Sequence, residues 1–86
     1  MLQDMPRNLR NWTYDDLIYF LKEHGFLYEK PLKGSHQCWI KRGESGECVN
    51  RVEVSIPQDS FKPKTMRIMI LKSGIAKEEW IKWANT

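Results

Sequence analysis

The chain has 86 residues, a formal net charge of +3 and two cysteines. A chain of this length forms one small domain, which buries only about 60% of the surface that its unfolded form exposes. Hydrophobic residues make up 41% of the sequence and include four tryptophans, so we expect a folded core rather than disorder. The positive charge is compatible with a phosphate or nucleic-acid partner.

The cysteines, Cys38 and Cys48, are too few for a disulfide scaffold. They could approach each other if residues 36–56 form a hairpin, but small apolar residues in a reduced cytosolic protein are the favoured interpretation. They lack zinc-ligand spacing, and no metal or other cofactor is expected. No apolar run is long enough for a signal peptide or a membrane span, so we expect a cytoplasmic protein without membrane contact.

We expect the chain to divide into a flexible N-terminal arm, residues 1–12, and a single domain, residues 13–86. Thr13 is a candidate N-cap, and Asp16 three residues later completes a pattern similar to a capping box. Apolar residues then recur at helical spacing and predict a helix over residues 14–24.

Three strands are expected next, over residues 26–29, 35–41 and 51–56. Glycine- and proline-containing turns separate them. The last strand alternates between polar residues and three residues expected to face the core: Val52, Val54 and Ile56.

Two helices complete the predicted chain, over residues 64–73 and 76–83. The first has Gly74 as its expected end and carries the apolar residues Met66, Ile70 and Leu71. The order α-β-β-β-α, followed by a short C-terminal helix, predicts an α+β fold with a three-stranded antiparallel sheet covered on one face by helices.

His36 follows a glycine turn at the mouth of the second expected strand, in a stretch that also contains basic residues. Lys33 precedes it, and Lys41 and Arg42 follow it. An imidazole titrates near neutral pH and can exchange a proton with a hydroxyl group, and a phosphodiester is the substrate that cations would attract. The alternative is a structural histidine at a strand start. Strand parity places its ring on the same face as the side chain of Cys38.

Other candidate RNA-binding groups lie in two segments. Lys33 is the nearest candidate for a phosphate clamp, Gly34 would leave space for a ligand, and Ser35 could bind a phosphate or cap the turn. Around the start of the next predicted helix, free backbone N–H groups could bind phosphate, assisted by three cations. These are Lys62, Lys64 and Arg67, for which an ordinary solvated charge set is the alternative.

Four segments together resemble the HicA toxins, also called YcfA-like proteins, of HicA–HicB toxin–antitoxin systems. They are His24-Gly25-Phe26, the run Lys33-Gly34-Ser35-His36, the strand with its proline at residues 52–57, and residues 61–75. The resemblance covers about residues 13–82. Family members often carry a second histidine two residues after the strand-ending proline, where this chain has Asp59.

The resemblance implies a fold similar to double-stranded-RNA-binding domains and an mRNA-cleaving activity. It also implies a HicB-like antitoxin that binds and blocks the enzyme in a hetero-oligomer. We expect His36 to act as a general base in metal-independent RNA cleavage. Two other functions remain open: a non-catalytic RNA-binding module of the same fold, and a protein-interaction domain with a basic face.

Overall fold

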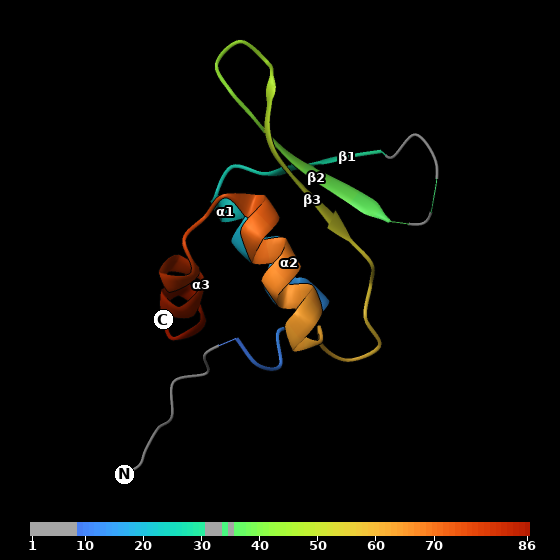
Figure 1. The fold of residues 1–86 in the computed structure, drawn as a ribbon, viewed down its shortest axis with the longest axis vertical. Helices are drawn as coiled ribbons and strands as arrows, with labels where there is room; N and C mark the ends of the chain where they lie inside the picture. The colour runs from blue at the N-terminus through green and yellow to red at the C-terminus, as the bar shows by residue number, and fades with distance from the viewer. Residues whose placement is uncertain (1–8, 31–33, 35) are drawn as a thin grey trace.

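The computed structural model describes residues 9–30, 34 and 36–86. These residues form helices on one side of a three-stranded antiparallel sheet (Figure 1). The elements in chain order are α1 (Tyr14–Glu23), β1 (Leu27–Glu29), β2 (Gln37–Arg42), β3 (Cys48–Val54), α2 (Pro63–Ser73) and α3 (Lys77–Ala84). The predicted α+β element order is confirmed. Among the described residues, no helix is sufficiently long and apolar to cross a membrane.

Helix α1 begins with the predicted capping box. The Thr13 hydroxyl accepts a hydrogen bond from the Asp16 backbone N–H at 3.2 Å, and the Asp16 carboxylate accepts one from the Thr13 N–H at 3.0 Å. These bonds satisfy two backbone donors that a helix start leaves free. His24 ends the helix, and its Nδ1 lies 2.8 Å from the Phe20 carbonyl oxygen. His24 therefore has a structural role.

The sheet has the strand order β1-β2-β3. Trp39 lies opposite Tyr28 on one side and Val52 on the other, so these three residues share a face. Trp39 is 5% exposed and belongs to the core, so its ring is not available to stack on a ligand. We call this the inner face, because the helices pack against it, and the opposite face the outer face.

The core is dominated by aromatic rings. Trp12 is fully buried, with its ring centroid 5.4 Å from that of Trp80 and 5.7 Å from that of Phe20. Its carbonyl oxygen also accepts a hydrogen bond from the Phe61 N–H at 2.9 Å. The predicted flexible arm includes Trp12, and the prediction is wrong for this residue. Residues 1–8 of the predicted arm lie outside the described residues.

Ile56 and Leu71, two apolar residues of the predicted elements, are exposed. Ile56 lies beyond the end of β3 and is 65% exposed, because β3 starts and stops earlier than predicted. Leu71 on α2 is 78% exposed, whereas Met69 is buried with Met66 against the core. The two methionines are three positions apart and share one face of the helix, and Leu71 points away from it.

The two cysteines do not approach each other in the hairpin, in agreement with the favoured interpretation of them as unpaired residues. Cys38 lies opposite Glu53, whereas Cys48 lies opposite Arg42 near the other end of the hairpin. Both thiols are free, the first buried and the second exposed.

Candidate functional site

His36 lies immediately before β2, at the end of the sheet where β3 finishes. Because side chains alternate along a strand, His36 projects to the outer face together with Cys38. Its side chain is 56% exposed. The ring is therefore accessible to a ligand.

A carboxylate lies beside the ring. His36 Nδ1 is 4.0 Å from Glu53 Oε1, and the Glu53 side chain is also 56% exposed. The second carboxylate oxygen of Glu53 lies 3.6 Å from Nη2 of Arg51. At 4.0 Å the carboxylate is beyond hydrogen-bond distance from the ring, but it forms an ion pair with the ring when the ring is protonated.

Glu53 was not among the residues predicted for the site. The alternation of β3 puts Glu53 and Arg51 on the face opposite the valines, and this was visible in the sequence. Their approach to His36 depends on the register that pairs Cys38 with Glu53. That register could not be read from the strand pattern alone, because the β-bulge between Lys41 and Arg42 shifts it.

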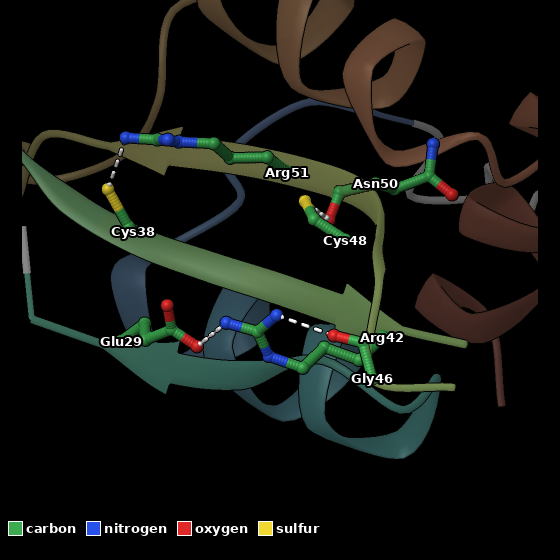
Figure 2. Close-up of polar contacts among 7 residues, drawn as sticks. All are labelled: Glu29, Cys38, Arg42, Gly46, Cys48, Asn50 and Arg51. Atoms are coloured by element: carbon green, nitrogen blue, oxygen red, sulfur yellow. Dashed lines mark hydrogen bonds and ion pairs between the residues drawn. The ribbon is translucent and has the colours of Figure 1, made fainter. Parts of the chain in front are cut away.

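The basic residues that follow His36 in sequence are not its neighbours. Arg42 lies at the far end of β2, about 20 Å away at the usual rise of an extended strand. Figure 2 shows Arg42 reaching across to Glu29 on β1 while it donates a 2.8 Å hydrogen bond to the Gly46 carbonyl oxygen. The hydrogen bond to Glu29 and the negative charge of this residue raise the pKa of Arg42 above its ordinary value. This arginine joins β1 to the β2–β3 turn.

Arg51 contacts the same Glu53 carboxylate as His36 on the outer face. Its Nη2 donates to the Cys38 Sγ atom at 3.1 Å, as Figure 2 shows. The side chain remains 52% exposed. Arg51 was also missed as a candidate, although an exposed guanidinium is suited to binding phosphate.

Of the turn before β2, the structure describes Gly34. It is exposed and has φ of +97°, a conformation that favours glycine. A Cβ built there would meet no heavy atom of the described residues within 4 Å. Lys33 and Ser35 lie outside the described residues.

The predicted cation set lies at the start of α2. Lys62 is the N-cap residue, Pro63 occupies the first turn, and no acidic side chain is present there. All three cations are exposed, and none forms an ion pair with a described carboxylate. They are Lys62, Lys64 and Arg67. A helix start combined with unpaired cations is suited to binding phosphate.

Helix α2 runs in the opposite direction to β3. The Asn50 side chain near the start of β3 donates to the Lys72 carbonyl oxygen at 3.3 Å, near the end of α2. The start of α2 therefore lies toward the end of β3, where Val54 pairs with Gln37 (Figure 1). His36 and the cation set occupy the same end of the sheet, although no described interaction joins them.

The site thus offers a proton acceptor and a separate group of cations. In the part of the chain that the structure describes, no three His, Cys, Asp or Glu side chains are grouped to hold a metal ion. Asp59, at the position of the second family histidine, is exposed. Comparisons of this chain with protein-family models, with curated proteins and with solved structures found no match.

Proposed function

We propose that the chain is an endoribonuclease of the HicA type, an mRNA interferase that a HicB-like antitoxin neutralises in the cytoplasm. The proposal includes a fold similar to double-stranded-RNA-binding domains. The observation that carries it is the half-exposed His36 ring on the outer face, at the end of the sheet near which α2 and its cations begin. The resemblance in sequence supplies the family.

The chemistry requires one proton acceptor at the ribose. His36 removes the proton of a 2′-hydroxyl group, and the oxygen attacks the adjacent phosphorus. The bond from phosphorus to the 5′-oxygen breaks, and this oxygen takes a proton from the imidazolium or from water, which the exposed site admits. The products are a 2′,3′-cyclic phosphate and a 5′-hydroxyl end. General-base catalysis of this kind contributes about 10²–10⁴-fold to the rate.

The cations position the RNA. Lys62, Lys64 and Arg67 bind backbone phosphates at the start of α2, with Lys33, Gly34 and Ser35 as further proposed contacts in the turn before His36. Arg51 stabilises the charge that develops on the phosphate oxygens, because its guanidinium lies beside the same Glu53 carboxylate as the ring. Glu53 orients the ring after it has taken up the proton.

A non-catalytic RNA-binding module is the second candidate. It is favoured by the acidic Glu53 beside His36, since a carboxylate repels a phosphate, and by the separation of the cation set from the ring. In that case the cations bind the RNA backbone and His36 performs no chemistry. The two functions differ in whether RNA is cut.

The test compares the wild-type chain with His36→Ala in growth arrest on expression and in RNA cleavage by the purified chain. We expect the variant to lose both activities, with a cleavage rate lower by about 10²-fold or more, and to retain nearly all RNA affinity. His24→Gln is the matched control, because it also removes an imidazole, and it should leave cleavage intact. Equal cleavage by the wild type and His36→Ala would refute the catalytic assignment, and binding without cleavage would support the second candidate.

A further inference from the structure

Strand β3 forms a free edge of the sheet. It pairs with β2 on one side, and no described residue adds a strand on the other. A groove of about 450 Å³ follows this edge between β3 and the α2 residues Ile68, Met69 and Lys72. The backbone N–H and C=O groups of an edge strand are a template for another strand.

The outer face of this edge carries two opposite charges. Arg51 and Glu53 are two positions apart, so both side chains project from the same face. They are 52% and 56% exposed, and either can turn toward a strand added at the edge. The charge pattern therefore indicates what kind of strand would fit.

A second copy of β3 is complementary to this pattern. If two copies pair antiparallel about a twofold axis that passes Val52, Arg51 of each copy lies directly opposite Glu53 of the other. Moving the axis to Arg51 places two arginines opposite each other, and moving it to Glu53 places two glutamates opposite each other. Opposite charges directly across a strand pair are stabilising and like charges are destabilising, so the charges select one register.

We propose that the chain forms a symmetric dimer through the β3 edges, with Val52 of one copy beside Val52 of the other. The two sheets become one continuous sheet, and Ile68, which is 50% exposed beside the groove, approaches the partner. The twofold axis is perpendicular to the sheet, so both outer faces, with both His36 rings, lie on the same side. The dimer does not depend on ribonuclease activity.

Charge reversal tests this register by sedimentation velocity of the full chain over a concentration series. The wild type should dimerise, and Arg51→Glu or Glu53→Arg alone should weaken the dimer by about tenfold or more, because each places like charges opposite each other twice. An equimolar mixture of the two variants should associate as a heterodimer, since every facing pair is again one glutamate and one arginine. The double variant R51E/E53R should dimerise by itself for the same reason.

Glu44→Arg is the matched control, because Glu44 is exposed in the turn and the substitution changes the net charge as Glu53→Arg does. It should leave the dimer unchanged, and circular dichroism should show that every variant is folded. A wild type that stays monomeric at all concentrations would overturn the proposal, as would a dimer that resists both single reversals. The proposal would also be overturned if the mixed variants formed no heterodimer, or if β3 paired only with a strand from another protein.

Discussion

Replacing Trp12 by alanine is expected to remove a large part of the stability of the fold. The Trp12 ring is fully buried and contacts Phe20, Trp80 and Trp83, with centroid separations of 5.2–5.7 Å. These partners lie on α1 and α3, so the ring joins the two helices to each other. Truncation leaves a cavity at this junction.

The size of the effect follows from comparable core truncations. Replacing a buried tryptophan by alanine costs about 3–5 kcal/mol of the free energy of unfolding. A domain of 86 residues has a total stability of about 4–13 kcal/mol. The substitution therefore removes about a quarter or more of the total, and at a urea m-value of about 1 kcal/mol per M it lowers the midpoint by about 3 M or more.

Urea unfolding followed by circular dichroism measures this change directly. Tyr19→Ala is the matched control, because Tyr19 is also a large aromatic residue but is 64% exposed on α1. We expect the control to change stability by no more than about 0.5 kcal/mol. A loss below about 1 kcal/mol for Trp12→Ala would show that residue 12 belongs to a loose arm, and the core described here would be wrong.

Two further predictions concern α2. Gly74→Ala should lower the free energy of unfolding in urea by about 1–3 kcal/mol, because Gly74 has φ of +73° and a Cβ would lie 2.7 Å from the Asn50 amide nitrogen. An unchanged urea midpoint would contradict this close approach. The triple variant Lys62→Gln, Lys64→Gln, Arg67→Gln should flatten the dependence of log Kd for RNA on log salt concentration by about 0.7–0.9 for each phosphate that these cations bind in the wild type. An unchanged slope would place the phosphates elsewhere.

Local signals in the sequence predicted most of the architecture. The capping box at Thr13, the alternation of Val52 and Val54, and the glycine that ends α2 each depend on neighbouring residues, and each is confirmed. The prediction failed at Trp12 because the surrounding residues are polar and its partners, such as Trp80, lie far away in sequence. Long-range packing of this kind leaves no periodic pattern in the chain.

The site shows the same division between local and long-range information. Strand parity correctly placed His36 on the face of Cys38. The short separation in sequence between His36 and Arg42 suggested that cations surround the ring, but the extended strand places Arg42 at its far end. Glu53 lies beside His36 because of strand register, which a bulge in the hairpin alters. Only the structure could therefore show which side chains lie close together across the sheet.

The ends of the RNA produced by the wild-type chain test the central claim most directly. If His36 activates the 2′-hydroxyl group, the fragments must carry 2′,3′-cyclic phosphate and 5′-hydroxyl ends, and RNA with 2′-deoxy sugars must remain uncut. His36→Ala should yield no such fragments above background. Fragments with 5′-phosphate ends, or cleavage of the 2′-deoxy substrate, would contradict the account.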